Sequence, residues 1–322
     1  MEQMRIVGTA KVVPEHIVTN DDLATIMDTN DEWIHSRTGI HRRHVVTSDN
    51  TSDLAIKVAQ ALLEQTGIDV LTLDFIIVGT MSPDSLTPSV AARVQGAIGA
   101  TNAFALDLDA ACSGFVYGLS TASAFLTARY SRGLVIGAEV LSKLLDWQDR
   151  SVSVLFGDGA AGVVVERTEA PVGLLAESLR TYGAQGEALV AGVLANENLT
   201  GKITAGDPYF HMDGRAVYSF ATREVPRVLT EALVKADLVA DDIDLFLLHQ
   251  ANSRIIDSIA KRFGQPIEKF PKNMAEYGNT SAASIGILLA ELQAAGQIQP
   301  GQKLALAGFG GGLTAGALII QV

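Results

Sequence analysis

Phe156-Gly-Asp-Gly159 and Phe309-Gly-Gly-Gly312 are two similar glycine-rich turns, and each leads into an apolar run of strand type. The strands expected after the two turns cover residues 162–165 and 315–320. The same order of elements precedes each turn: helix, strand, helix, strand, helix, strand. The sequence therefore predicts a duplicated α/β unit of about 150 residues.

The apolar spacing places these elements along the chain. In the first half it predicts helices at 54–65, 88–98 and 112–128, and strands at 75–79, 104–109 and 134–137. In the second half it predicts helices at 216–235, 252–263 and 281–295, the first interrupted at Pro226, and strands at 244–248, 269–271 and 303–307. A glycine-rich stretch at 167–213 is expected to connect the halves, which we place at residues 1–170 and 171–322. The fold class is α/β, with two similar sheets and helices between and outside them.

The composition narrows the class of protein. Of 322 residues, 48% are hydrophobic and 19% charged, which excludes a disordered chain, and a single cysteine excludes a disulfide framework and indicates a reducing compartment. A formal net charge of -12 argues against nucleic acid or an anionic membrane surface as a partner. The uncharged runs at 110–128 and 304–322 are too polar or too rich in glycine to cross a membrane. Residues 1–10 are predicted to form a strand and not a secretion signal.

Cys112 is the first candidate for chemistry. It lies in the sequence Asp109-Ala-Ala-Cys-Ser-Gly114, a tight strand-to-helix junction with small residues on both sides. A helix N-terminus lowers the pKa of a thiol because it stabilises the thiolate. The alternative is an inert packing cysteine. Gly114 and a turn similar in logic to a nucleophile elbow favour a nucleophile.

His249 and Asn279 are the second and third candidates. His249 ends an apolar strand in the motif HQAN, and Asn279 precedes an apolar helix in the motif GNTSAAS. The alternatives are a hydrogen-bonded junction histidine and an ordinary helix N-cap. Thr280 and Ser281 can cap that helix equally well, which leaves the Asn279 amide free to donate. A pseudo-twofold would bring Cys112 and Asn279 to equivalent places, beyond the carboxyl ends of the strands, where ligands bind in such sheets.

Three other patterns have simpler interpretations. His41 and His44 flank two arginines and have no third ligand, so a metal site there is improbable. The glycines from 157 to 162 match GxGxxG, but a strand follows them, so no helix N-terminus is available for a dinucleotide. The glycines from 310 to 312 lack the Lys-Ser/Thr of a phosphate loop; they indicate a tight turn or a backbone N–H directed at an oxyanion.

A basic face is expected on the helix after His249. Arg254 and Lys261 share this face, with Arg262 at its edge, while the isoleucines of the helix point the other way. Such a face is often only solvated. In a chain of negative charge it also suits the docking of an acidic partner.

Together these motifs resemble β-ketoacyl-acyl carrier protein synthase III over nearly the whole chain. The motifs are AACSG around Cys112, HQAN from His249, GNTSAAS around Asn279 and the closing FGGG, and Asp31-Glu-Trp-Ile34, Arg37-Thr-Gly-Ile40, Asp149-Arg150 and Phe156-Gly-Asp-Gly159 also match the family. The resemblance implies a thiolase-like, duplicated αβαβα fold with two mixed five-stranded sheets.

The resemblance also implies an initiating condensation of fatty acid synthesis. An acyl group passes from coenzyme A to Cys112, and malonyl-acyl carrier protein then loses carbon dioxide and attacks the acyl-enzyme to give a 3-oxoacyl-carrier protein. The N–H groups of Cys112 and Gly311 would stabilise the oxyanion, and His249 and Asn279 would hold the enolate. Phe309 would shield the site. No metal and no redox cofactor is implied, since acyl-coenzyme A is a substrate.

Binding residues carry over in the same way. In relatives, the residues matching Trp33 and Arg150 sandwich the adenine. The path of coenzyme A would be lined by Arg37, Gly214, Tyr218 and Asn252, and the carrier would dock on Gln250, Arg254, Lys261 and Arg262. One docking cation of the family is Ser219 here, so carrier binding should depend more on Arg215 and Arg254. A cytoplasmic homodimer is implied as well.

One departure from the family concerns the acyl pocket. Several relatives restricted to short primers have Phe where this chain has Thr87, often supplied by the partner subunit, so we expect tolerance of primers longer than acetyl. Three alternatives remain open: a ketoacyl synthase of secondary metabolism, a Cys-His-Asn hydrolase, and an inert acyl-binding protein.

Overall fold

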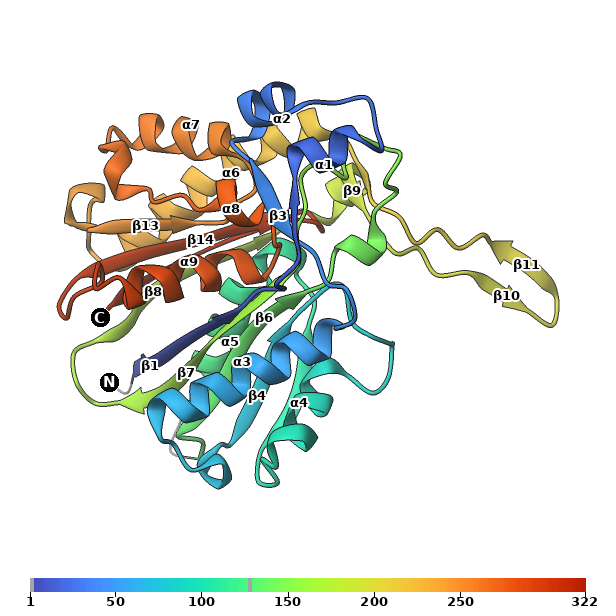
Figure 1. Ribbon diagram of the computed structural model, residues 1–322. Helices are drawn as coiled ribbons and strands as arrows, with labels where there is room; N and C mark the ends of the chain where they lie inside the picture. Colours follow the sequence, from blue (N-terminus) through green and yellow to red (C-terminus); the bar gives the residue numbers. More distant parts are fainter. Residues whose placement is uncertain (1–2, 127–128) are drawn as a thin grey trace.

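The computed structural model describes residues 3–126 and 129–322 (Figure 1). The predicted strand at 1–10 and the predicted helix at 112–128 extend onto residues 1–2 and 127–128, which lie outside the described residues. Within the described residues the order of elements follows the predicted duplication.

The first sheet is mixed and has five strands, as expected. Their order across the sheet is β1 (Gln3–Val12), β7 (Gly159–Thr168), β6 (Arg132–Glu139), β4 (Phe75–Gly79) and β5 (Phe104–Leu108). The strand β4 pairs in parallel with β5 and β6, and β7 is antiparallel to both β6 and β1. Every residue of β4 is buried, in keeping with an uninterrupted apolar run covered on both faces.

The second sheet has four strands among the described residues, and here the expectation of five is wrong. The order is β13 (Leu245–Leu248), β14 (Lys303–Gly310), β15 (Thr314–Gln321) and β8 (Gly173–Thr181). The missing strand is the one predicted at 269–271. Residues Ile267–Lys269 instead form the 3-10 helix η6, between Pro266 and Pro271. Proline supplies no N–H to a ladder, so this stretch cannot extend the sheet beside β13.

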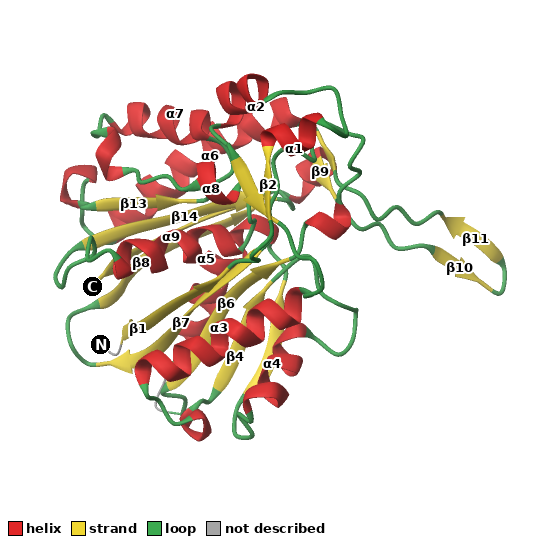
Figure 2. Cartoon of the chain, in the orientation of Figure 1, coloured by secondary structure: helices red, strands yellow, loops and turns green. Residues whose placement is uncertain are grey.

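Helices form three layers around the two sheets (Figures 1 and 2). The helices α5 (Gly114–Phe125) and α9 (Ala283–Ala294) lie between the sheets and pack against both. The outer face of the first sheet carries α3 (Thr51–Thr66) and α4 (Val90–Ile98). The outer face of the second carries α6 (Gly214–Lys235), on which α7 (Ser253–Phe263) packs. Three large apolar clusters fill the spaces between these layers.

The helix α6 continues through Pro226 and is not interrupted there. A proline leaves the carbonyl four residues earlier without its usual N–H partner. That carbonyl belongs to Thr222, and the Arg262 guanidinium of α7 donates to it (Nη1 to O, 3.2 Å). This contact joins the two helices.

The chain crosses from the first sheet to the second between Thr168 of β7 and Gly173 of β8. The division at residues 170 and 171 stays a prediction. The stretch expected to be only a connection contains β8, the 3-10 helix η4 (Gly183–Ala188), and the strands β9 (Leu189–Val190), β10 (Asn196–Asn198), β11 (Gly201–Thr204) and β12 (His211–Met212). The hairpin of β10 and β11 projects away from the body of the molecule (Figure 1).

Smaller elements complete the fold. They are β2 (Ile17–Thr19), α1 (Asn20–Ala24), α2 (Asp31–Thr38), β3 (Arg42–His44) and α8 (Met274–Tyr277), with the 3-10 helices η1 (Val70–Thr72), η2 (Ala111–Ser113), η3 (Ser142–Leu144) and η5 (Ala240–Asp242).

Candidate active site

Two turns of the same geometry precede the central helices. The Asp109 carboxylate accepts the N–H of Ala111 (3.0 Å), and the Asn279 side-chain oxygen accepts the N–H of Ser281 (2.9 Å). Ala111 and Ser281 both have positive φ, at 45° and 47°, a conformation that L-residues rarely adopt. Asn279 therefore corresponds to Asp109 under the pseudo-twofold. The expected equivalence of Asn279 with Cys112 is wrong by this register.

Cys112 follows the strained Ala111 in the buried 3-10 helix η2, which leads directly into α5. Its side chain is 6% exposed. Burial raises the pKa of the Cys112 thiol to about 12, and the nearby Glu139 and Asp109 carboxylates act in the same direction. Desolvation therefore outweighs the lowering effect of the helix N-terminus on the pKa of this thiol. The thiol is protonated until a reaction partner removes its proton.

The last glycine-rich turn packs directly against the cysteine. A Cβ placed on Gly310 would lie 2.7 Å from Cys112 Cβ and 3.0 Å from Sγ, so only glycine allows this approach. The Thr314 hydroxyl lies 3.0 Å from the carbonyl of Gly311 and 2.9 Å from the Ser113 hydroxyl, and so ties the turn to the cysteine loop.

His249 is 1% exposed at the end of β13. Burial lowers its pKa to about 3, so the imidazole is neutral over the physiological range. Nδ1 lies 2.7 Å from the Ser284 hydroxyl, which also accepts the N–H of Gln250 (3.4 Å). When the hydroxyl donates to Nδ1, the neutral ring carries its hydrogen on Nε2. The ring of Phe309 meets that of His249 edge-on, with 5.0 Å between centroids.

Asn279 is held by the backbone on both sides. Its N–H donates to Leu155 (2.8 Å), and its carbonyl accepts the N–H of Gly157 (3.0 Å). Because the side-chain oxygen is bound to Ser281, the NH₂ group is the end available to donate to a ligand. The predicted caps are wrong: the N-cap of α9 is Ala282, without a side-chain cap bond.

One cavity of about 910 Å³ contains the three candidate residues. It brings together Cys112, His249, Asn279 and Phe309 with Trp33, Arg37, Gly214, Arg215, Tyr218, Asn252 and Arg254. The predicted residues Thr87, Arg150, Gln250, Lys261, Arg262 and Gly311 do not line it. The ends of β13 and β14, the start of α6 and the start of α7 meet here, so residues far apart in sequence share one pocket.

Two guanidinium groups lie beside the indole of Trp33, which lines this cavity. The Trp33 ring centroid lies 4.7 Å from Arg37 and 5.3 Å from Arg150. Arg150 also donates to Asp28, through both the backbone carbonyl and the carboxylate. A flat base must separate Arg150 from the indole to stack between them. Asn252 caps α7 and donates to the Arg37 carbonyl (3.0 Å), so its side chain positions α2 against α7.

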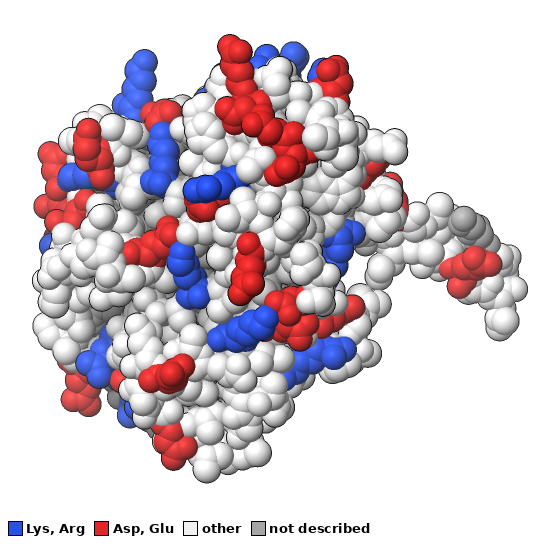
Figure 3. Space-filling model, in the orientation of Figure 1, with Lys and Arg blue, Asp and Glu red and all other residues white. Residues whose placement is uncertain are grey.

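The basic face of α7 is present, with one correction. Arg254, Lys261 and Arg262 are exposed, and the isoleucines of the helix are buried as expected. Gln250 is 1% exposed, and its amide bonds to Leu248 (2.8 Å) and to Asn273 (3.0 Å). Gln250 therefore cannot belong to a docking surface. Over the face seen in Figure 3, basic and acidic side chains are interspersed, so the attraction of an acidic partner must be local.

Thr87 lies on an exposed loop before α4, next to the strongly exposed Leu86. Within one chain it contributes nothing to the cavity around Cys112. Gly311 lies in the turn after β14, beside Ala111.

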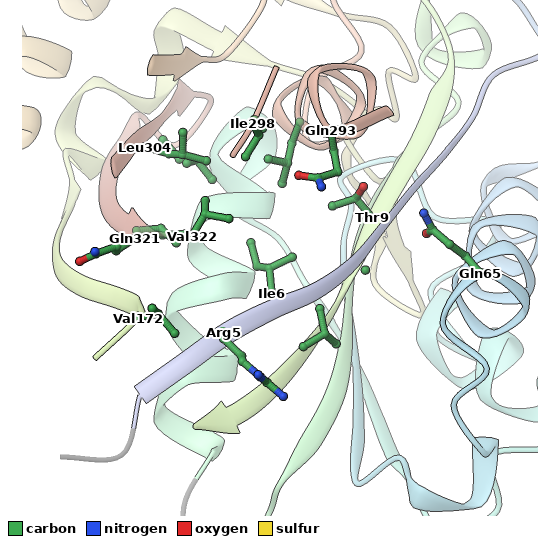
Figure 4. A pocket seen from close by; sticks show the side chains of 15 residues that line it. Arg5, Ile6, Thr9, Gln65, Val172, Gln293, Ile298, Leu304, Gln321 and Val322 are labelled. Atoms are coloured by element: carbon green, nitrogen blue, oxygen red, sulfur yellow. The ribbon is translucent and has the colours of Figure 1, made fainter. Parts of the chain in front are cut away.

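A second cavity, of about 300 Å³, lies at the opposite end of β14 (Figure 4). Leu304 and Ile320 line it together with β1, and its polar rim includes Gln65 and Gln293. Its lining contains neither a cysteine nor a histidine.

The GxGxxG match contributes to the site without binding a nucleotide. A strand and not a helix is found here, as expected, and this strand, β7, begins at Gly159 inside the match. A Cβ on Gly157 would lie 2.3 Å from the Tyr277 carbonyl, so this glycine permits the approach of the Asn279 loop. His41 and His44 pair with Asp31 and Glu276. Among residues 3–126 and 129–322 no group of three potential ligands could hold a metal ion, and no helix of that part is long and apolar enough to span a membrane.

A buried cysteine, a neutral histidine and an asparagine line one pocket, and this set of groups suits an enzyme that transfers acyl groups through a cysteine. Family models for 3-oxoacyl-[acyl-carrier-protein] synthase III match residues 106–183, and those for its C-terminal part match residues 233–322. The chain is 54% identical to the β-ketoacyl-[acyl-carrier-protein] synthase III of Streptococcus suis, over 99% of this chain and 98% of that one. It is 52% identical to the enzyme of the same name from Lactococcus lactis, over 99% of both chains.

Solved structures of this family have the same fold as this chain. The crystal structure of 3-oxoacyl-[acyl-carrier-protein] synthase III from Aquifex aeolicus superimposes with a TM-score of 0.92 at 39% identity, covering 99% of this chain and 100% of that one. This chain belongs to the β-ketoacyl-[acyl-carrier-protein] synthase III family, in the thiolase superfamily, and is an acyltransferase of fatty acid biosynthesis.

Several residues of the site were not singled out for these roles from the sequence. Ser284, which holds His249, and Thr314, which ties the two loops together, are small polar residues in apolar runs. Glu139 is a buried carboxylate at the last position of the apolar strand β6, and a charged residue at the end of an apolar run was the available signal for it.

Proposed function

We propose that this chain joins an acyl group from acyl-coenzyme A to the two-carbon unit of malonyl-acyl carrier protein, with Cys112 as the nucleophile. The observation that carries the proposal is the single cavity in which Cys112, His249 and Asn279 lie together. The products are coenzyme A, carbon dioxide and a 3-oxoacyl-carrier protein.

In the first half-reaction the Cys112 sulfur attacks the thioester carbonyl as the thiol loses its proton. Coenzyme A leaves as a thiolate, and the acyl group stays on the enzyme as a new thioester. Negative charge collects on the carbonyl oxygen during the attack. The N–H groups of Cys112 and Gly311 are the proposed donors to that oxygen, supported by the packing of the last glycine-rich turn against the cysteine loop.

In the second half-reaction the malonyl group loses carbon dioxide, and the enolate that forms attacks the acyl carbonyl. His249 and Asn279 each offer a neutral N–H donor to the enolate oxygen. Neutrality favours this step, because a cation in the site would hold the malonyl carboxylate and oppose its loss. The buried ring of Phe309 against His249 keeps water away from the enolate.

Acyl-coenzyme A binds along the cavity, with its adenine near Trp33. The adenine stacks between Trp33 and Arg150, and Arg37, Gly214 and Tyr218 line the path of the pantetheine chain, with Asn252 holding the helices that form it. The carrier docks on Arg254, Lys261 and Arg262, with Arg215 in support. We assign a cytoplasmic homodimer, and none of these steps needs a metal or redox cofactor.

Thr87 belongs to the acyl pocket only if a partner subunit supplies it. A Thr in place of a ring leaves room for branched or medium-chain primers. Replacing Thr87 with Phe should remove activity on longer primers and leave acetyl transfer intact. Retention of longer-chain activity in Thr87→Phe would count against this role.

The test is the intact mass of the protein after incubation with a panel of acyl-coenzyme A thioesters. The proposal predicts one acyl adduct, absent in Cys112→Ser. Decay of the adduct to free acid would indicate the hydrolase, and absence of any adduct the inert acyl-binding protein. Activity with malonyl-coenzyme A in place of malonyl-carrier protein would indicate a ketoacyl synthase of secondary metabolism.

A further inference from the structure

One face of α6 carries a row of exposed polar side chains that leads away from the active site. Arg215, Ser219, Arg223 and Arg227 follow one another at steps of four residues, and all four are exposed. Residues four apart in an α-helix share one face and lie about 6 Å apart along its axis. The row therefore runs about 18 Å, from Arg215 at the cavity around Cys112 to Arg227.

The far end of this row borders a groove of about 570 Å³ between α6 and α7. Arg223 and Arg227 line the groove from α6, and Arg262 lines it from α7. Both helices begin at the cavity around Cys112, so the groove lies farther along the same seam between them. Arg262 belongs to the groove and also to the basic face of α7, which makes the two surfaces continuous.

A buried carboxylate holds two of these arginines in place. Glu224 is buried beside the groove, and its carboxylate accepts the hydroxyl of Tyr182 (2.5 Å). The same carboxylate lies 2.6 Å from Arg223 Nε and 3.5 Å from Arg227 Nη1. The side chains of Arg223 and Arg227 nevertheless remain 57% and 52% exposed. Because the anion is buried and the cations are exposed, this cluster presents positive charge to the solvent in a fixed position.

The second glutamate of the groove is also bound by arginines. Arg180 of β8 donates to the two oxygens of Glu231 through Nε (2.9 Å) and Nη2 (2.8 Å), and Arg227 Nε donates to it as well (3.2 Å). Together with Arg223 and Arg262, four arginines therefore stand against two glutamates in this region. A local excess of positive charge, in a chain whose formal net charge is -12, attracts an anionic partner to this place.

We propose that the groove between α6 and α7 binds an acidic helix of malonyl-acyl carrier protein, and that Arg223 and Arg227 are its contacts there. The inference rests on the proposed function and extends the carrier-binding surface beyond the face of α7. A helix with carboxylates four residues apart repeats its charges at the same steps of about 6 Å as the row on α6. Ser219 leaves one step of the row without a cation, so binding depends on the two arginines beyond it. The malonyl thioester enters the cavity at the Arg215 end.

Other anions fit this groove less well. A nucleic acid or an anionic membrane needs an excess of positive charge over a wide surface, which the net charge of -12 opposes. A free phosphate needs guanidinium groups that converge on one point. The row instead sets Arg223 and Arg227 about 6 Å apart along the helix axis, which suits separate carboxylates.

The experiment measures the KM for malonyl-acyl carrier protein, at low and at high salt, in wild type, Arg223→Gln, Arg227→Gln and the double variant. Glutamine removes the charge and keeps a side-chain donor near the buried Glu224. Arg5→Gln is the matched control, because Arg5 is 48% exposed, pairs with Glu166 and lies by the second cavity, at the opposite end of β14.

At low salt we expect the KM for malonyl-carrier protein to rise about threefold in each single variant and about tenfold in the double variant. The increase should shrink at high salt, because these charges are exposed and screened. Arg5→Gln should keep the wild-type KM, although it changes the net charge by the same amount. The rate at saturating carrier should stay at the wild-type value in all variants.

Malonyl-pantetheine is the second extender, because it brings the reacting group without the carrier protein. Its condensation should proceed equally in all variants. A wild-type KM for malonyl-carrier protein in the double variant would overturn the groove, and so would an equal loss with malonyl-pantetheine, which would mean a structural role only. A matching rise in the KM for acetyl-coenzyme A would overturn it too, in favour of a phosphate site. If the wild-type protein forms no acyl-enzyme, the proposed function itself falls.

Discussion

Removing the hydroxyl of Ser284 should separate the two half-reactions. Ser284 is buried on α9 and lies 2.7 Å from His249 Nδ1. In Ser284→Ala that nitrogen loses its partner in a site closed to water, at a cost of about 1–3 kcal/mol. Since about 1.4 kcal/mol corresponds to tenfold in rate, decarboxylation and condensation should slow by about 5-fold to about 140-fold. Acylation of Cys112 should stay within about twofold of wild type, because it does not use His249.

The assay follows release of carbon dioxide from malonyl-carrier protein and, separately, the rate of acyl adduct formation by intact mass. Ser120→Ala removes another buried serine, from α5, and serves as the control for loss of a hydroxyl between the sheets. Equal losses in both half-reactions, or an unchanged rate of decarboxylation, would refute the assignment of His249 as a donor positioned by Ser284.

Three further predictions concern the cavity and its mouth. Gly310→Ala places a methyl group 2.7 Å from Cys112 Cβ, and acylation should fall by about tenfold or more, measured as adduct formation at saturating acyl-coenzyme A; unaltered acylation would contradict the tight packing. Trp33→Ala should raise the KM for acyl-coenzyme A about tenfold without changing the rate at saturation, because a stacking surface for adenine is lost; a drop in the saturated rate alone would exclude the adenine site. Lys261→Glu should raise the KM for malonyl-carrier protein, most strongly at low salt, and leave the KM for acyl-coenzyme A unchanged; equal effects on both substrates would rule out a carrier-specific contact.

Much of the fold was predictable because the elements repeat. The strands after the two glycine-rich turns, the central helices and the run at 75–79 have unambiguous apolar periods, and the structure confirms them. The prediction of a strand at 269–271 was wrong, because the apolar pattern is short and Pro266 and Pro271 disfavour pairing in a sheet. The predicted interruption of the helix at Pro226 was wrong for a reason that lies outside that helix: Arg262 of α7 donates a hydrogen bond to the carbonyl of Thr222.

The sequence was enough to select the candidate residues of the site, but not to predict the pKa of the thiol or the residues that hold the candidates in place. Motif positions identified Cys112, His249 and Asn279, and all three line one cavity. The pKa of the Cys112 thiol depends on the number of atoms packed around it, which the sequence does not reveal, and in the structure burial raises it. Ser284 contacts a residue distant in sequence, so no local pattern distinguishes it from an ordinary packing residue.

The most direct test of the proposed function follows the transfer of a preformed acyl group from Cys112 to the carrier protein. Protein acylated on Cys112 is freed of coenzyme A and mixed with malonyl-carrier protein, and both proteins are weighed by mass spectrometry over time. We expect the acyl mass to leave the enzyme and to appear on the carrier as the 3-oxo product longer by two carbons. We also expect His249→Ala and Asn279→Ala to hold the adduct but to transfer it far more slowly. Transfer at the wild-type rate in both variants, or loss of the adduct as free acid, would contradict the proposed function.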